Sequence, residues 1–435
     1  MEKGRIIEVL SKWNFWKNDL DVGIPRQEYL RKILNFIKTD KVISVVGARR
    51  TGKSTLIKQI IKSLIQEGVN RNGTLMINFE EPEFENTDLK LLDKIYQAYR
   101  EIIQPVQKPF LFLDEIQNVS GWERFVRSLN ERKESFITIS GSSSKLLSSE
   151  LSTVLTGRQL YFDIFPLSFK EFLAFKGIGP EDEKDLLLNS LPVKKALREY
   201  LEFGGFPEVV LNQNPEFKIR VNRSYYEDII NKDIIQRFRI KKIEQMRALA
   251  RFYLTNISSL MNFHKAGEFI KTPVETIRRF SSYLEAANLV FFIKRFSFSV
   301  KEQENSPRKV YSIDTGISNS IGFRFSYNWG KLLENVVAIE LKRRQSENPM
   351  LEFYYWKDPL GKEVDFLVKE NWEIKELIQV CLDISDQETK KREINSLKKA
   401  MKNLKIKEST VITEDYEGED KKITYIPLWK WLYKR

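Results

Sequence analysis

The chain has 435 residues, which is too long for one typical hydrophobic core and predicts two to four domains. Hydrophobic residues make up 42% and charged residues 30%, which indicates a globular protein, and no apolar run approaches the roughly 18 residues needed to span a bilayer. One cysteine and one histidine exclude an internal disulfide framework and a histidine-rich metal site.

The formal net charge of +12 favours a polyanionic partner, most often nucleic acid. A lysine-rich surface that serves solubility or heat tolerance explains the same charge equally well. The mixed, charged first residues contain no signal-peptide core, so a cytoplasmic protein is expected.

The stretch Val42–Leu56 predicts a loop that binds the phosphates of ATP. The apolar run Val42–Val46 predicts a buried strand, and apolar residues recur at helical spacing after Lys53. A glycine loop in this setting lets backbone N–H groups and a helix N-terminus converge on an anion. We expect Lys53 to reach the β- and γ-phosphates and the Ser54 hydroxyl to ligate Mg²⁺. The expected ATP-binding residues are Gly47, Ala48, Arg49, Arg50, Thr51, Gly52, Lys53, Ser54 and Thr55.

A second apolar run, Phe110–Leu113, predicts a strand buried on both faces that ends in Asp114 and Glu115. Sheets of this class bind ligands at the carboxyl ends of their strands. We expect Asp114 to hold the Mg²⁺ shell and Glu115 to polarise the attacking water as general base. Asp-Glu pairs also cap helices, but this pair follows a phosphate loop.

Three further strands are expected at 74–79, 136–140 and 161–165. After the second of these, Ser140 and Ser142 are candidates for contacting the γ-phosphate, although capping of a helix that starts near Leu146 explains them equally well. Arg158 is a candidate arginine finger, in its own subunit or from a neighbour, and an ordinary surface arginine fits the pattern equally well.

The combination GARRTGKST, LFLDEIQ, SGSSSKLL, LTGR and FPLSFKEFL resembles the archaeal and bacterial AAA+-type ATPases of the AAA-14 group. GGFPEVV, YYEDIINKDI, KVYSIDTGI, LLENVVAIEL and GKEVDFLV extend the resemblance over nearly the whole chain. It implies an α/β P-loop NTPase core over 1–165, a helical lid over 166–235, a winged helix over 236–304 and a nuclease-like domain over 305–435.

The winged helix also has a signal of its own. Thr272-Pro273-Val274-Glu275 predicts a capping box with proline at the first helical position, and 248–260 and 266–270 predict the other helices. Residues 289–296 predict a wing strand. The expected DNA-contacting residues are Lys271, Arg278, Arg279, Lys294 and Arg295. Contacts with other domains or proteins are the alternative role of such a helix.

The C-terminal region alternates strand and helix and matches part of the PD-(D/E)xK pattern of restriction-endonuclease-like domains. Glu334 on a helix and Asp365 in a strand are the candidate ligands of a second metal site. The chain departs from the pattern at Gln379-Val380-Cys381, where Glu-x-Lys is expected, which leaves cleavage in doubt unless Lys362 or Lys369 supplies the missing charge.

These features predict an ATP- and Mg²⁺-dependent ATPase whose cycle moves the lid and the winged helix against duplex or branched DNA. One alternative is a nucleotide-dependent switch that binds a protein partner. Another is an ATP-regulated, metal-dependent nuclease. A homo-oligomer is compatible with each of these functions.

Overall fold

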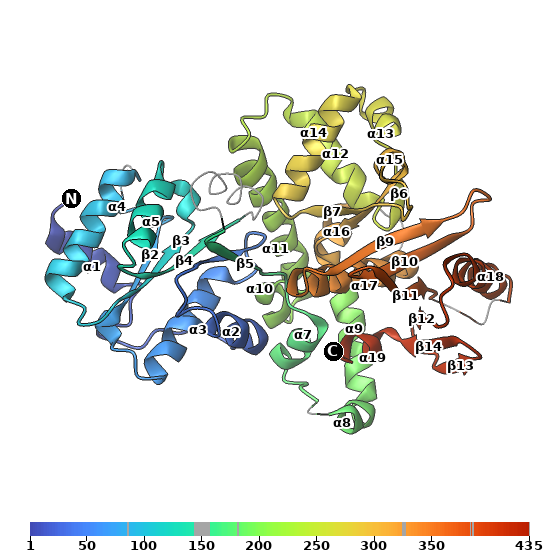
Figure 1. The fold of residues 1–435 in the computed structure, drawn as a ribbon, viewed down its shortest axis with the longest axis horizontal. Coiled ribbons are helices and arrows are strands. Elements are labelled where there is room, and N and C mark those ends of the chain that lie inside the picture. The colour runs from blue at the N-terminus through green and yellow to red at the C-terminus, as the bar shows by residue number, and fades with distance from the viewer. Residues whose placement is uncertain are drawn as a thin grey trace. The chain divides into compact units, whose positions relative to one another are not determined.

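A computed structural model describes residues 1–84, 87–142, 157–180, 182–323, 328–382, 384 and 387–434, with the backbone alone at 387–390. The chain divides into two compact units, Met1–Ile164 and Phe165–Arg435, each described here by itself (Figure 1). Among the described residues, no helix combines the length and the hydropathy that crossing a membrane would need.

The first unit is built on a five-stranded sheet with the order β2-β3-β4-β1-β5, and all its neighbouring strands pair in parallel. The mixed α/β architecture and the parallel sheet fit the expected P-loop NTPase class. The fifth strand lies two residues earlier than expected. The strands are β1 (Val42–Val46), β2 (Thr74–Asn78), β3 (Phe110–Asp114), β4 (Phe136–Gly141) and β5 (Gln159–Asp163).

Helices cover both faces of this sheet, because alternate strand residues point to opposite sides. Leu75 and Ile77 of β2 pack in the core that α1, α4 and α5 complete, whereas Met76 packs in the core of α2 and α3 (Figure 1). The elements between the strands are α1 (Lys3–Ser11), α2 (Gln27–Leu34), α3 (Lys53–Gln66), η1 (Arg71–Gly73), α4 (Leu89–Ala98), the π-helical η2 (Tyr99–Ile103), η3 (Ile116–Asn118) and α5 (Trp122–Glu131).

The second unit begins with a largely helical segment, as the sequence predicted for 166–235. Its first helix starts with a capping box, in which Ser168 Oγ accepts from the Glu171 N–H and the Glu171 carboxylate accepts from the Ser168 N–H. The segment contains α7 (Phe169–Phe175), α8 (Glu183–Leu188), α9 (Ser190–Phe203), α10 (Pro207–Leu211), α11 (Pro215–Asp228) and the π-helical η4 (Ile229–Gln236).

Five helices and a small antiparallel sheet of order β6-β8-β7 follow. The predicted capping box at Thr272 is wrong: α14 begins at Val274 without a side-chain cap, and Thr272 Oγ1 donates instead to the Ile270 carbonyl at 3.3 Å. Strand β8 pairs with both β6 and β7, so it belongs to this small sheet. The domain boundary expected at residue 304 therefore falls too early. The elements are α12 (Ile243–Thr255), β6 (Ser259–Met261), α13 (Phe263–Ile270), α14 (Val274–Ala286), β7 (Val290–Ile293), α15 (Val300–Asn305), β8 (Arg308–Ser312) and α16 (Thr315–Ile321).

The C-terminal part is a six-stranded mixed sheet with the order β13-β14-β12-β11-β10-β9. Phe366 and Val368 of β10 pack in the core that contains α17 and α19, whereas Leu367 packs in the core that contains α18. The elements are α17 (Trp329–Glu347), β9 (Leu351–Lys357), β10 (Glu363–Glu370), β11 (Glu373–Val380), α18 (Gln387–Leu404), β12 (Ser409–Thr413), β13 (Gly418–Asp420), β14 (Ile423–Pro427) and α19 (Leu428–Tyr433).

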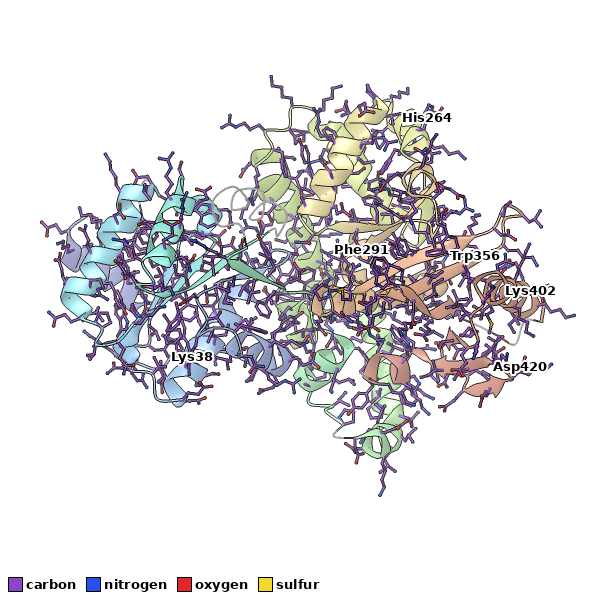
Figure 2. All side chains as sticks on the ribbon, viewed as in Figure 1. Lys38, His264, Phe291, Trp356, Lys402 and Asp420 are labelled. Carbon is purple, nitrogen blue, oxygen red and sulfur yellow. The ribbon has the colours of Figure 1, made fainter. Side chains whose placement is uncertain are left out.

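Side chains fill the interior of this second unit. Phe291 on β7 and Trp356 on β9 are buried, while His264 on α13 lies at the periphery (Figure 2).

Two of the sequence motifs interlock in the second unit. The buried Asp314 accepts from the Gly205 N–H at 2.7 Å and caps α16 by accepting from the Ile317 N–H at 3.2 Å. Gly204 has φ +82° and ψ −168°, a conformation open to glycine alone, and a Cβ atom there would lie 2.0 Å from Asp314 Oδ1. The motifs GGFPEVV and KVYSIDTGI therefore hold α9 and α16 together, which is a structural role.

Replacing Gly204 by alanine should destabilise the second unit by at least about 2 kcal/mol, because backbone strain and a steric clash add up. The urea midpoint of the full chain, followed by tryptophan fluorescence, measures the effect. Gly179→Ala is the matched control, since its added methyl group would meet no atom within 4 Å, and it should change stability by less than about 0.5 kcal/mol. Equal midpoints for the two variants would contradict the interlock.

Candidate functional site

The loop between β1 and α3 has the geometry of an anion cradle. Gly47 has φ +153°, and a Cβ atom there would lie 2.1 Å from the Ile164 carbonyl oxygen, so no side chain fits. Gly52 has φ +90° and precedes α3 without any side-chain cap. The first N–H groups of α3 therefore have no capping side chain, and they carry the positive end of the helix dipole.

Lys53 places a buried ammonium group in this loop. Its side chain is only 3% exposed, and Nζ donates to the carbonyl oxygens of Gly47 and Ala48, each at 3.2 Å. The Glu115 carboxylate lies 3.5 Å from the same Nζ atom. An ammonium group held by weak carbonyl contacts can turn to phosphate oxygens that enter the loop.

Asp114, at the end of β3, carries an unsatisfied oxygen. Oδ1 accepts from Ser140 Oγ, whereas Oδ2 is buried and has no hydrogen-bond partner among the described residues. Burial and the neighbouring Glu115 raise the pKa of Asp114, and hydrogen bonding to Ser140 and Ser54 opposes that rise. Buried polar atoms in folded proteins are nearly always paired, and Mg²⁺ takes oxygen ligands. Ser54 and Asp114 therefore fit a Mg²⁺ ion that accompanies a nucleotide.

Glu115 is buried, yet the structure favours its ionised form. Burial raises its pKa, but the charge of Lys53 and a hydrogen bond from Gln117 outweigh burial, so the pKa of Glu115 lies below its usual value. Its backbone N–H donates to Ser140 Oγ at 3.0 Å, and its φ of +52° marks the sharp turn after β3. An ionised carboxylate fixed at the carboxyl end of a strand is able to act as a general base.

The other predicted ATP-binding residues lie on or beside the same loop. Arg49 pairs with Glu80, Arg50 is exposed with φ +70°, and the buried Thr51 donates through Oγ1 to the Ala48 carbonyl at 2.9 Å. Thr55 is exposed on the first turn of α3, and Ser142 is buried directly after β4. Ser140 forms hydrogen bonds with Asp114 and with the backbone N–H of Glu115. The helix expected near Leu146 lies outside the described residues.

Arg158 cannot act as an arginine finger on the loop of its own chain. Its backbone oxygen accepts from the Val42 N–H at 2.8 Å, so it lies at the amino end of β1, whereas the loop follows the carboxyl end. Five residues of strand separate the two ends by roughly 15 Å. Its exposed guanidinium lies 3.4 Å from Glu131. A role of Arg158 in a neighbouring subunit stays a prediction.

Arg26 contacts the phosphate loop, although no motif in the sequence singles it out. It is 3% exposed, its Nη1 donates to the Thr51 carbonyl at 3.0 Å, and its guanidinium lies 4.6 Å from the Tyr29 ring centroid. Its backbone N–H donates to Gln59 Oε1 on α3 at 3.1 Å. No spacing rule links Arg26 to a loop 25 residues later, so only the fold reveals this support.

The predicted metal ligands Glu334 and Asp365 do come together, but an ammonium group lies between them. Lys309 Nζ on β8 contacts Glu334 at 3.0 Å, Asp365 at 2.8 Å and Glu363 at 2.8 Å. Burial lowers the pKa of Lys309, and the three carboxylates more than reverse that effect. Burial, together with the smaller effect of the neighbouring Asp365 charge, raises the pKa of Glu334 to about 7. We call Lys309, Glu334, Glu363, Asp365 and Gln379 the Lys309 cluster.

Protein donors already satisfy the Asp365 carboxylate in this cluster. Asp365 Oδ1 accepts from Lys309, and Oδ2 accepts from Gln379 Nε2 at 2.8 Å and from the Val380 N–H at 3.0 Å. Lys369, one of the expected substitutes for the missing lysine, pairs with Glu352 instead. Among the described residues, no group of three or more acidic, cysteine or histidine side chains is arranged to hold a metal ion. The expected second metal site does not fit these residues.

Lys309 should be essential to the stability of the second unit. Lys309→Met would leave buried carboxylates without their counter-ion, which should destabilise the unit by about 3–5 kcal/mol. Lys357→Met is the control, because Lys357 bonds the same Glu363 at 3.0 Å from a half-exposed position and should contribute less than about 1 kcal/mol. Urea unfolding of both full-length variants measures the difference, and equal stabilities would rule out the central role of Lys309.

The basic residues predicted to contact DNA separate into two sets. Lys271 is exposed at the C-cap of α13, and Arg278 and Arg279 are exposed on α14, where the Arg278 guanidinium lies 5.2 Å from the Phe263 ring centroid. The other two are engaged within the unit: Lys294 pairs with Glu304, and Arg295 pairs with Glu302 at 2.8 Å and donates to the Lys357 carbonyl. The structure therefore leaves three of the five residues open to a ligand.

The chain matches three family models: an AAA domain over residues 39–173, a domain of unknown function (DUF8612) over 194–326, and another (DUF4143) over 329–431. It is 35% identical to uncharacterized protein MJ1544 of Methanocaldococcus jannaschii, over 90% of this chain and 88% of that protein. It is 32% identical to an uncharacterized protein of Haemophilus influenzae, over 83% of this chain and 88% of that protein. Uncharacterized protein MJ1637 of M. jannaschii is 25% identical, over 97% and 90% of the two chains.

Proposed function

The chain belongs to the family that includes uncharacterized protein MJ1544 and carries an AAA domain, and on this premise we propose that it hydrolyses ATP to ADP and phosphate. The observation that carries the proposal is the unpaired Asp114 Oδ2 beside the buried pair of Lys53 and Glu115. Three groups thus lie at one phosphate cradle: Asp114 with an oxygen free for a metal ion, the cation Lys53, and the candidate general base Glu115.

Each side chain has a distinct role in this reaction. The N–H groups of Gly47–Ser54 bind the phosphates, and Lys53 neutralises charge on the β- and γ-phosphates. Ser54 and Asp114 would hold Mg²⁺, and the bound ion would neutralise further charge on those phosphates. Glu115 takes the proton of the attacking water. Arg26 supports the loop through its hydrogen bond to the Thr51 carbonyl.

Phosphate release by the full chain tests the proposal. ATP turnover is expected with Mg²⁺ and should vanish when excess chelator removes the ion. Turnover that is absent under both conditions, or that the chelator does not change, would overturn it.

We also propose that α14 contacts duplex DNA, so that nucleotide hydrolysis is coupled to DNA binding. The exposed Lys271, Arg278 and Arg279 support this role, since arginines on a helix reach phosphates and guanine edges in the major groove. Lys294 and Arg295 are not part of the proposed surface, because internal acids and carbonyls engage them.

Arg278→Gln/Arg279→Gln should weaken binding of a labelled duplex and lower the slope of log K against log salt by roughly 0.9 per lost phosphate contact. The control, Lys184→Gln/Lys195→Gln, removes the same charge from exposed positions on α8 and α9. Duplex binding that is absent, or equal in all three proteins, would favour the alternative, a nucleotide-dependent switch that binds a protein partner.

A further inference from the structure

The second unit contains a hollow that neither of these functions uses. Three segments form most of its lining: the chain after β7, the hairpin that joins β10 to β11, and the residues between α18 and β12. Gln303 of α15 and Tyr354 of β9 complete it. Its volume is about 1010 Å³, at the upper end of the range for ligand-binding pockets. We call this hollow the hairpin groove.

Trp372 stands at the tip of the hairpin and is 94% exposed. Glu370 pairs with Glu373, so Asn371 and Trp372 form a two-residue loop. Asn371 supplies the left-handed conformation, with φ +54°, and asparagine tolerates it well. Turn chemistry therefore gives no reason for tryptophan at this position, and the fold gains almost no buried area from its ring.

A second exposed ring lies on another segment that lines the groove. Phe298 is 89% exposed and meets Phe296 edge to face, with ring centroids 5.2 Å apart. Phe296 in turn meets Tyr354 of β9 edge to face at 5.8 Å. These ring contacts hold Phe298 in place while its own ring stays open to a ligand. Single exposed rings are common on protein surfaces, whereas two in one groove indicate a binding site.

Lysines give the same groove a positive charge. Four lysines and two glutamates line it, and Lys369 and Lys375 pair with Glu352 and Glu373. Within the described part of the chain, Lys405 and Lys407 form no ion pair, and both are exposed. Lys405 ends α18 with φ +58°, a position where glycine is the usual residue. The groove therefore combines open aromatic faces with unpaired ammonium groups.

We propose that the hairpin groove binds single-stranded nucleic acid. Every unpaired base offers a flat face on which Trp372 and Phe298 stack, and the phosphates of the strand pair with Lys405 and Lys407. A duplex keeps its bases stacked on one another and offers the rings no such face. An acidic protein would satisfy the lysines but leaves the exposed rings unexplained. This site is separate from the duplex contact proposed for α14 and does not depend on ATP hydrolysis.

Fluorescence anisotropy of a labelled mixed-sequence 20-nucleotide strand, with the full chain, tests the proposal. Trp372→Ala should weaken binding by about five- to a hundredfold, and Trp372→Phe should restore much of it, because a ring stacks and a methyl group does not. Lys405→Gln/Lys407→Gln should lower the salt slope by roughly 0.7 per lost phosphate contact.

Matched variants separate the groove from general effects. Leu188→Ala removes another side chain that is 76% exposed, and Lys184→Gln/Lys195→Gln removes two charges elsewhere; both should bind the strand like the wild type. The Arg278→Gln/Arg279→Gln variant, which lacks the proposed duplex contact, should bind the strand more tightly than the matching duplex. Unchanged strand binding by Trp372→Ala, or equal competition by a polyglutamate peptide, would overturn the proposal.

Discussion

Lys53→Ala should lower ATP turnover by roughly a thousandfold, because removing one preorganised charge donor from a site of this kind costs about 10²–10³ in kcat. Lys53 is the only lysine of the phosphate loop, and its Nζ lies 3.2 Å from the carbonyl oxygens of Gly47 and Ala48 in that loop. Phosphate release at saturating Mg²⁺ and ATP measures the effect.

Loss of folding must be separated from loss of catalysis in this variant. The alanine leaves the buried Glu115 without its cation, and breaking a buried pair is destabilising. Lys53→Arg keeps a positive charge but lacks the compact ammonium group, so it should remain folded and inactive. Lys62→Ala, on the same helix, should retain full turnover. Normal turnover in a folded Lys53→Arg variant would refute the assigned role.

Glu115→Gln should keep nucleotide binding and lose hydrolysis by about 10²–10⁴-fold. The amide is nearly isosteric with the carboxylate, so contacts with neighbouring side chains largely persist. It cannot accept the proton of water, however, and Lys53 holds the native carboxylate in its ionised form. Single-turnover phosphate release, together with the Kd of a fluorescent ATP analogue, separates the two effects.

Glu134→Gln is the control for this variant, since Glu134 is a half-exposed glutamate of the same unit that pairs with Arg132. It should change neither Kd nor turnover. If Glu115→Gln lost nucleotide binding together with hydrolysis, Glu115 would be a binding residue, and the water-activating role would be wrong.

The phosphate loop could be predicted from sequence because its determinants are local. The apolar run before Gly47 and the helical spacing after Lys53 are set within fifteen residues, and β1 and α3 start where they were expected. Asp114 and Glu115 followed from the unbroken apolar run before them. The predicted bounds of β5 lie two residues too late, because this strand depends on pairing with β1 rather than on its own pattern.

Long-range contacts decided the features that sequence reasoning missed. The pattern of Glu334 and Asp365 indicated a metal site, and nothing local showed that Lys309 reaches both carboxylates from another sheet. A lysine in the buried strand β8 was the available signal, since lysine is almost never fully buried without partners. The sequence left open whether Arg158 serves its own subunit, because proximity to a strand does not tell which end of the sheet a residue faces.

The central claim is that a triphosphate binds between β1 and α3, and a crystal structure with a nonhydrolysable ATP analogue and Mg²⁺ tests it most directly. The phosphates should lie on the N–H groups of Gly47–Ser54, with Lys53 Nζ turned from the Gly47 and Ala48 carbonyls to the phosphate oxygens and Mg²⁺ bound by Ser54. An analogue bound elsewhere while this loop keeps its present contacts would contradict the claim.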